Sequence, residues 1–358
     1  MPKIAFLGAG SIGFGRRLIG DIVSFPELAD SSVHLMDPNE ERLEFIRAAA
    51  GKMVEAHGLP TRIEASTERE PALDGADYVI VSIRVGRDMR EEQLDVQIPI
   101  DVCGLRQTVS DTVGVGGVMK GLRTIPAMLD IARDMERLCP HAVMLNYTNP
   151  MAMIMWAIAE ATSISAVGLC HSVQHTHDQL ANYLGLERPS MKTQVAGINH
   201  MAWFIELRQG RKNLYPRLRE CLDDPEIFAR DPVRFEIFRH FGYFVTESST
   251  HMAEYVPYFM KDQAEIERLS IKQRSGETFA GQQGGRKQML EKAWKELDES
   301  APAIKCSNEY AAAIMHAMET NTACCIYGNV PNNGLISNLP EDSCVEVPCL
   351  INRAGLQP

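Results

Sequence analysis

The sequence lacks the features of several classes of protein. It has no excess of basic residues, since 36 Lys and Arg stand against 47 Asp and Glu and give a formal net charge of -11 at pH 7. An acidic surface repels nucleic acids and anionic membranes unless it carries a concentrated basic patch, and the sequence contains none. No apolar run approaches the roughly 20 residues that span a bilayer. We therefore expect neither a nucleic acid nor a membrane as a partner.

The start of the chain and its cysteines are not the pattern expected of a secreted, disulfide-bonded protein. A strand-like run begins two residues after Met1, without the apolar core and cleavage site of a signal peptide. The nine cysteines are odd in number and scattered, and some, such as Cys324 and Cys325, stand in apolar surroundings. A disulfide framework does not fit this pattern. We therefore expect a reduced, cytoplasmic protein.

The amino-terminal segment contains a strand, a glycine turn and a helix in that order. The apolar run Lys3–Leu7 precedes the turn Gly8-Ala9-Gly10-Ser11-Ile12-Gly13. In dinucleotide-binding folds the first glycine permits the tight turn, the second lets the backbone approach a pyrophosphate, and the third allows close helix packing. Asp37 ends the next predicted strand, where a carboxylate accepts hydrogen bonds from ribose hydroxyls and favours NAD over NADP. The expected NAD contacts are Gly8, Gly10, Ser11, Ile12, Gly13 and Asp37.

Strand-like and helix-like segments alternate up to about residue 195, which predicts a Rossmann-like α/β fold with a doubly wound parallel sheet. Polar residues at 84–90, 146–149 and 170–172 follow predicted strands, so we expect them to converge at the carboxyl ends of the sheet. Residues 1–195 are predicted to be the NAD-binding domain and 196–358 an α+β substrate domain, as in lactate and malate dehydrogenases. The Gln- and Gly-rich stretch 276–286 predicts a flexible loop.

Cys170 and His200 are candidate metal ligands. A thiolate and an imidazole suit a borderline divalent transition metal that keeps open positions for substrate oxygens. The two residues lie far apart in the sequence, and one Cys with one His is more often a buried structural cysteine and a core histidine. The H-E-x-x-H signature of metal hydrolases is absent. Their spacing alone therefore does not establish a metal site.

Several segments together resemble glycoside hydrolase family 4. They are Asn146-Tyr147-Thr148-Asn149-Pro150, Cys170-His171-Ser172-Val173, Gly197-Ile198-Asn199-His200-Met201 and Thr246-Glu247-Ser248-Ser249-Thr250-His251-Met252-Ala253-Glu254-Tyr255. Tyr327-Gly328-Asn329 and Cys344-Val345-Glu346-Val347-Pro348-Cys349 are similar to late segments of the family, so the resemblance covers essentially the whole chain. Relatives that act on 6-phosphoglycosides have Cys-Asn or Cys-Asp followed by proline at Cys170. The Cys-His-Ser-Val of this sequence instead resembles the α-galactosidase branch.

The resemblance implies two cofactors and the residues that hold them. Cys170 and His200 would bind a divalent metal, commonly manganese in this family. NAD would lie on the glycine turn and Asp37. His171 occupies the position beside the metal cysteine that is implicated in protonating the leaving group.

The resemblance also implies the base and the substrate contacts. Tyr255 or His251 lies where the family places its base, and the sequence leaves this choice open. Asn149 would contact substrate hydroxyls, and Asp111 matches an acidic position in the family. Arg90, in the polar cluster at 84–90, is a further candidate for substrate binding.

The implied activity is cleavage of α-galactosides through transient oxidation of the sugar at C3 by NAD. The oxidation makes the C2 hydrogen acidic, a base removes it, the group at C1 leaves by elimination, water adds and the hydride returns. A family 4 α-glucosidase, an α-galacturonidase or an α-glucuronidase remains an alternative. Outside the family, a hydroxy-acid dehydrogenase and a non-catalytic dinucleotide sensor remain.

The expected partners are a small-molecule glycoside and further copies of the same chain in a homo-oligomer. Family members continue beyond the counterpart of Gln357-Pro358. We therefore expect the chain to lack the family's final helices.

Overall fold

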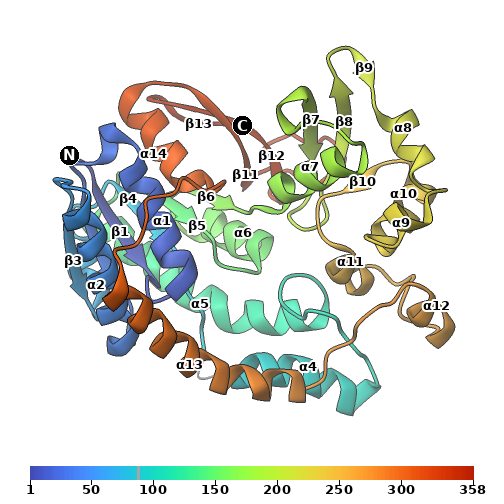
Figure 1. The fold of residues 1–358 in the computed structure, drawn as a ribbon, viewed down its shortest axis with the longest axis horizontal. Helices are drawn as coiled ribbons and strands as arrows, with labels where there is room; N and C mark the ends of the chain where they lie inside the picture. The colour runs from blue at the N-terminus through green and yellow to red at the C-terminus, as the bar shows by residue number, and fades with distance from the viewer. Residues whose placement is uncertain (87–88) are drawn as a thin grey trace.

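A computed structural model describes residues 1–86 and 89–358, with side chains throughout except at 279–284. Residues 87 and 88, part of the polar cluster predicted at 84–90, lie outside the described residues. Figure 1 shows a larger α/β body and, beside it, a smaller body with its own sheet. Within the described part of the chain, no helix has the length and apolar character needed to cross a membrane.

The larger body is built on a nine-stranded sheet in the order β13-β12-β11-β6-β5-β4-β1-β2-β3. Six strands pair in parallel: β1 (Lys3–Leu7), β2 (Ser32–Met36), β3 (Arg62–Ser66), β4 (Tyr78–Val81), β5 (Val143–Asn146) and β6 (Ser165–Leu169). The strand order reverses between β1 and β4, where doubly wound sheets bind their ligands. The predicted Rossmann-like sheet is confirmed.

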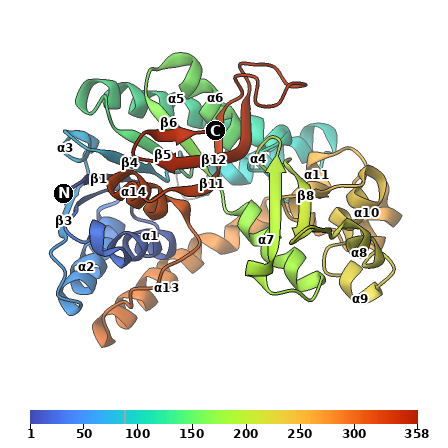
Figure 2. The ribbon, with the colours of Figure 1, turned by 90° about the horizontal axis from the view of Figure 1, so that it is seen from above.

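Helices cover both faces of this sheet, as Figure 2 shows with α5 and α6 on one face and α1 and α2 on the other. Alternate residues of β1 supply the two cores, since Ile4 and Phe6 face one apolar cluster while Ala5 and Leu7 face the other. The helices of this body are α1 (Ile12–Ser24), α2 (Glu40–Ala56), α3 (Arg69–Leu73), α4 (Arg90–Cys103), α5 (Gly114–Leu138), α6 (Met151–Ala161), α13 (Glu277–Glu299) and α14 (Tyr310–Thr320), with the short 3-10 turn η1 (Pro26–Leu28).

The smaller body is an antiparallel sheet covered by short helices, which confirms the predicted α+β unit. Its strands are β7 (Met191–Ala196), β8 (Trp203–Gln209), β9 (Lys212–Asn213) and β10 (Phe244–Val245). Its helices are α7 (Ser172–Tyr183), η2 (Arg188–Ser190), α8 (Tyr215–Glu220), α9 (Pro225–Phe228), α10 (Pro232–Phe241), α11 (Ser249–Tyr255) and α12 (Gln263–Arg268). Phe204, Phe235, Phe238 and Phe244 form the centre of its apolar core.

The last strands of the chain return to the larger body. β11 (Cys324–Pro331), β12 (Cys344–Asn352) and β13 (Gly355–Gln357) form the antiparallel edge of the nine-stranded sheet, where β11 pairs with β6. The range 196–358 therefore contributes to both bodies rather than to the smaller one alone.

The prediction of a flexible loop at 276–286 is wrong, because almost all of this stretch belongs to helix α13. Leu290, Ala293 and Leu297 of this helix are buried against Phe45 and Ala49 of α2. Their spacing places them on one helical face. This tertiary packing outweighs the weak helix propensity of the glycines in the first half of α13.

Candidate active site

The structure brings Cys170 and His200 together between the two bodies. Cys170 follows β6, at the carboxyl edge of the parallel sheet, and His200 lies in the connection from β7 to β8. The Cys170 Sγ and the His200 Nε2 are 3.6 Å apart, and both side chains are buried. Two residues from different bodies thus form one pair.

Glu247 completes a group of three metal-ligating side chains and was not singled out from the sequence. Its Oε2 lies 3.3 Å from the His200 Nε2, and the ligand atoms of Cys170, His200 and Glu247 all lie within 4.8 Å of one another. Thiolate, imidazole and carboxylate together fit a divalent transition metal. Glu247 stands in the segment 246–255 quoted for the resemblance, but no spacing rule marks it as a ligand.

The backbone around His200 is held in an unusual conformation. His200 has a φ of 66°, in the left-handed region that residues with a side chain rarely adopt. Gly197 has a φ of 153°, and a Cβ there would lie 2.6 Å from the Ala202 Cα, so only glycine fits. Backbone strain of this kind persists where the surrounding structure enforces it, and it is frequent at functional sites.

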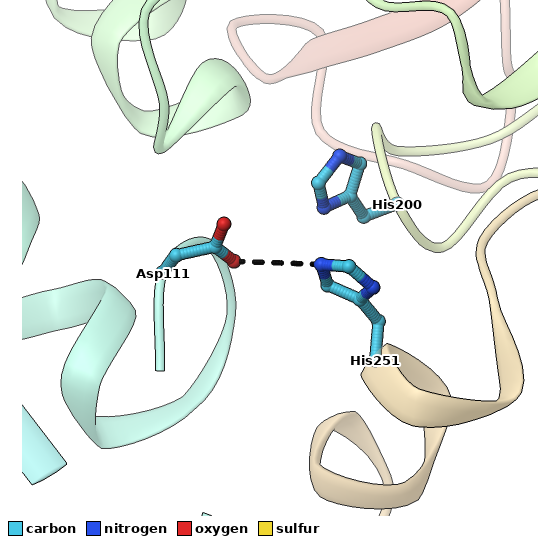
Figure 3. A group of neighbouring side chains, drawn as sticks. All are labelled: Asp111, His200 and His251. Carbon is cyan, nitrogen blue, oxygen red and sulfur yellow. Dashed lines mark ion pairs between the residues drawn. The ribbon is translucent and has the colours of Figure 1, made fainter. Parts of the chain in front are cut away.

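A second set of side chains surrounds the other ring nitrogen of His200. Figure 3 shows Asp111, His200 and His251 converging from three separate segments. The Asp111 Oδ1 lies 3.8 Å from the His251 Nε2. The Tyr255 hydroxyl oxygen lies 3.1 Å from the His200 Nδ1 and 3.5 Å from the Asp111 Oδ1. The ligand atoms of Asp111, His200 and His251 also lie within 4.8 Å of one another. The candidate base residues and Asp111 therefore adjoin the candidate metal ligands.

The two nitrogens of His251 have different surroundings. Its Nδ1 lies 2.8 Å from the Ser248 Oγ and 3.2 Å from the Glu247 Oε1, whereas its Nε2 faces Asp111. A carboxylate beside one nitrogen orients the ring and leaves the other nitrogen for proton transfer. Burial alone would raise the pKa of Glu247, but the hydrogen bond with His251 and the charges of His200 and His251 hold that pKa well below its usual range.

Burial opposes ionisation of the other proton-carrying groups of the site. It raises the pKa of the Cys170 thiol to about 12, and the neighbouring carboxylates of Glu346 and Glu247 act in the same direction. Burial also raises the pKa of Tyr255 far above its usual value, and Asp111 adds to this effect. A nearby cation would reverse these effects, because it favours the thiolate and the phenolate.

His171 lies at the edge of the group, next to Cys170. It is the N-cap residue of α7, its side chain is 49% exposed, and its Nδ1 lies 3.6 Å from the Oε1 of Glu309. The Glu309 side chain is only 6% exposed, lies 3.8 Å from an Arg17 nitrogen, and was also missed from the sequence. Burial lowers the pKa of His171 although Glu247 opposes this change. The imidazole is therefore partly open to solvent and oriented by a carboxylate.

Two predicted substrate contacts lie outside this group. Asn149 is half-buried in the turn after β5, where its Oδ1 accepts a hydrogen bond from the Met151 amide. Arg90 is exposed as the first residue of α4. Among the described residues, no contact joins either side chain to Cys170 or His200. Their roles in substrate binding stay predictions.

The glycine turn meets the structural requirements of a dinucleotide site, but the glycine that allows close helix packing is not the predicted Gly13. Gly8 has a φ of 81°, and a Cβ there would lie 2.2 Å from the Ser82 carbonyl oxygen. A Cβ on Gly15 would lie 2.4 Å from the Ala9 carbonyl oxygen, whereas one on Gly13 would meet nothing within 4 Å. The glycine that allows close packing is therefore Gly15, because the phase of α1 turns Gly13 toward open space.

The residues at this turn fit the pyrophosphate and ribose of NAD. Helix α1 has no acidic residue in its first turn, and its N-cap Ser11 makes no side-chain capping bond, so amides and the positive dipole end remain for an anion. Asp37 accepts hydrogen bonds from the amides of Gly10 and Asn39, each at 2.9 Å. These bonds hold its carboxylate at the end of β2, as a ribose contact requires.

Family models match nearly the whole chain. Residues 3–186 match the family 4 glycosyl hydrolases, and residues 195–358 match the C-terminal domain of the same family. The chain belongs to glycosyl hydrolase family 4. The α-galactosidase of Bacillus subtilis is 39% identical to this family 4 member over 100% of this chain and 83% of the relative. The α-galactosidase of Rhizobium meliloti is 38% identical over 99% and 74% of the two chains.

Solved structures share the fold of this chain. The crystal structure of LplD from Bacillus subtilis matches this family 4 chain with a TM-score of 0.86 and 27% identity, over 100% of this chain and 86% of that chain. A 6-phospho-β-glucosidase of Thermotoga maritima, solved with manganese, NAD+ and glucose-6-phosphate, has a TM-score of 0.77 at 21% identity, over 99% and 82%. Lactate dehydrogenase of Eimeria maxima shares the fold, with a TM-score of 0.60 at 14% identity, over 100% and 85%. The predicted dehydrogenase-like architecture is confirmed.

Proposed function

We propose that this family 4 member is an α-galactosidase that uses NAD and a divalent metal such as Mn2+. The observation that carries the proposal is the convergence of Cys170, His200 and Glu247 beside His251 and Tyr255. A hydrolase that works with two carboxylates alone has no need for such a donor set. The two α-galactosidases at 39% and 38% identity support the choice of sugar, as does the Cys-His-Ser-Val segment.

Two separate sets of residues would hold the cofactors. NAD would lie on Gly8, Gly10, Ser11, Ile12, Gly13 and Asp37. The metal would be held by Cys170, His200 and Glu247. The third of these, Glu247, is proposed from its position in the structure and not from the sequence. When bound, NAD supplies a hydride acceptor and donor, and the metal supplies a Lewis acid for a sugar oxygen.

The side chains of the protein would move the protons. The acidic proton at C2 of the sugar must be taken by a base next to the metal ligands, and two candidates have this position. The Nε2 of His251 is available because Glu247 and Ser248 hold the Nδ1. The second candidate is the Tyr255 hydroxyl oxygen, which lies 3.1 Å from the Nδ1 of His200. At the edge of the group, His171 would donate a proton to the departing glycosidic oxygen, oriented by Glu309.

The charge of the group favours a neutral sugar over the anionic substrates of the family. Asp111 lies beside the proposed metal ligands, and its carboxylate would repel a uronate or a sugar phosphate. A galactoside without an anionic group meets no such repulsion. We therefore propose a neutral α-galactoside as the substrate, ahead of an α-galacturonide.

The experiment that tests this function measures the incorporation of deuterium from heavy water at C2 of the released sugar. The protein is supplied with NAD, Mn2+, a thiol reductant and nitrophenyl α-galactoside in heavy water, with the α-glucoside and the α-galacturonide assayed alongside. The released galactose should carry deuterium at C2, without net accumulation of NADH. Protium alone at C2, formed by fully active protein, would eliminate the redox mechanism. Stoichiometric NADH would instead indicate a hydroxy-acid dehydrogenase.

A cytoplasmic location and assembly into a homo-oligomer stay proposals. Mass measurement by light scattering during size-exclusion chromatography tests the second of these directly. A single species at the mass of one chain, 39.9 kDa, would contradict it.

A further inference from the structure

Two late segments of the chain, 327–329 and 344–349, meet next to the candidate metal ligands although no role was assigned to them. Asn329 of β11 is paired directly with Glu346 of β12. The Glu346 Oε1 accepts hydrogen bonds from the Nδ2 atoms of Asn199 at 3.2 Å and Asn329 at 3.4 Å. All three residues have 0% exposure. They form a wholly buried polar cluster, which we call the Glu346 hub.

The Glu346 hub is connected to the segments that carry both Cys170 and His200. The Asn329 Nδ2 also donates to the Gly168 carbonyl oxygen at 3.1 Å, two residues before Cys170. On the other side, the backbones of Glu346 and Gly197 exchange hydrogen bonds of 3.1 and 2.7 Å. Asn199 immediately precedes His200. One carboxyl group thus connects the end of β6 with the loop from 197 to 201.

This connection opposes the relaxation of the His200 loop. His200 keeps a left-handed φ of 66°, a conformation that an unrestrained residue with a side chain leaves readily. Hydrogen bonds on both sides of Ile198, at Gly197 and at Asn199, restrain the loop in this conformation. In a formed metal site the ligand distances lie within about 0.2 Å of their preferred values, so a relaxed loop would move the His200 imidazole away from this geometry and weaken metal binding.

The Glu346 hub is costly to the fold, which argues against a purely structural purpose. Three of its buried oxygens have no hydrogen-bond partner among the described residues: Glu346 Oε2, Asn199 Oδ1 and Asn329 Oδ1. Leaving buried polar atoms unpaired disfavours folding, and an apolar cluster of the same size would avoid this loss. Unpaired buried polar atoms are uncommon in protein interiors, so apolar packing does not account for the choice of these three residues.

We propose that Glu346 is a positioning residue that sets the geometry of the Cys170–His200 metal site through Asn199 and Asn329. This inference rests on the proposed function, because it takes Cys170 and His200 as ligands of Mn2+. Glu346 itself touches neither the substrate nor the cofactor in this proposal. It acts by hydrogen bonding, so a side chain that keeps the acceptor oxygen should replace it.

The test measures Mn2+ binding to the isolated full chain by calorimetry and by the electron paramagnetic resonance of bound Mn2+, with NAD binding measured in parallel. Glu346→Ala should weaken Mn2+ binding about 10- to 100-fold, the range typical for residues that orient metal ligands. NAD binding should stay unchanged. Glu346→Gln should restore Mn2+ affinity to within about threefold of the original, because its Oε1 still accepts both amide hydrogen bonds.

A matched control removes a buried carboxylate that lies outside the Glu346 hub. Asp21 has 1% exposure, and it accepts hydrogen bonds of 2.6 Å from the amide and the hydroxyl of Ser307. Asp21→Ala should lower the free energy of unfolding and leave Mn2+ affinity unchanged. If Glu346→Ala does not fold, Asn199→Ala removes one connection without altering a strand, and it should weaken Mn2+ binding about tenfold.

The results separate this inference from the proposed function. Absence of Mn2+ binding by the unaltered protein would contradict the proposed function. Normal binding by the unaltered protein together with undiminished binding by Glu346→Ala, or by Asn199→Ala, would overturn the role of the hub alone. A Glu346→Gln variant as weak as Glu346→Ala would also overturn it, because the charge rather than the hydrogen bonds would then be acting.

Discussion

The two cofactor regions of this molecule are assembled in different ways. The proposed NAD region comes from one continuous stretch, in which β1, the glycine turn, α1 and β2 follow one another up to Asp37. The proposed metal region draws Cys170, His200 and Glu247 from three segments that belong to different elements of both bodies. A local motif organises the first region, whereas only the docking of the two bodies creates the second.

This difference has an energetic consequence. The NAD region depends on backbone amides, glycines and one carboxylate that neighbouring residues hold in place. The metal region depends on buried side chains whose pKa values are shifted and on a strained residue, His200. Changes at the metal region should therefore affect catalysis most strongly, and changes at the NAD region should be confined to NAD affinity and stability.

The largest effect is expected at the base. Either Tyr255→Phe or His251→Asn should lower kcat by about 10²- to 10⁴-fold, because a general base is then lost. In the variant that loses the base, deuterium incorporation at C2 of the sugar should fall together with turnover. Both variants should bind NAD normally, since the NAD region lies on other elements. The assignment fails if both variants keep more than about a tenth of the original kcat.

A smaller effect is expected at Asp37. Asp37→Ala should weaken NAD binding by about 10- to 100-fold, because hydrogen bonds to a charged carboxylate contribute about 1.5 to 3 kcal/mol. Mn2+ affinity should not change, because the two regions share no residue. Calorimetric titration with NAD and with Mn2+ separates the two effects. A comparable loss of Mn2+ affinity would show that the two regions are not independent.

The two regions should also differ in their response to pH. Burial raises the pKa of the Cys170 thiol to about 12, so Mn2+ must displace a thiol proton at neutral pH. Mn2+ affinity should therefore rise at least about tenfold for each pH unit between pH 6 and 8. NAD affinity should be nearly constant over this range, since its binding displaces no thiol proton. Cys170→Ser should reduce the slope, and a flat profile in the unaltered protein would contradict the thiolate ligand.

The smallest effect distinguishes two glycines of the same helix. Gly15→Ala should lower the free energy of unfolding by about 1 to 3 kcal/mol, because the added Cβ would lie 2.4 Å from the Ala9 carbonyl oxygen. Gly13→Ala should change that free energy by less than about 1 kcal/mol, since its Cβ meets open space. Denaturant unfolding of the protein without NAD gives both values. Equal destabilisation by the two variants would restore Gly13 as the packing glycine.

The amino-acid sequence was sufficient to predict those features that depend on neighbouring residues. The alternation of apolar segments predicted the parallel sheet, and the run from Lys3 to Gly13 with Asp37 predicted the dinucleotide region. Cys170 and His200 were candidate ligands by side-chain type, but their spacing carries no signal, and only the resemblance to a family supported a metal site there. His251 and Tyr255 were named only because of that resemblance. Their proximity in the structure adds the distances that spacing could not supply.

Tertiary structure alone decided the remaining features. Glu247, which precedes α11, and Glu309, the N-cap residue of α14, became site residues because their carboxylates lie beside His200 and His171. Strands β11 to β13 joined the first sheet, and 276–286 became part of α13, a helix that packs against α2 and α4. The residues that flank a glutamate in the sequence do not reveal whether its carboxylate will lie on the solvated surface or beside a histidine. Long-range contacts and burial decide which role it takes, and these arise only when the chain folds.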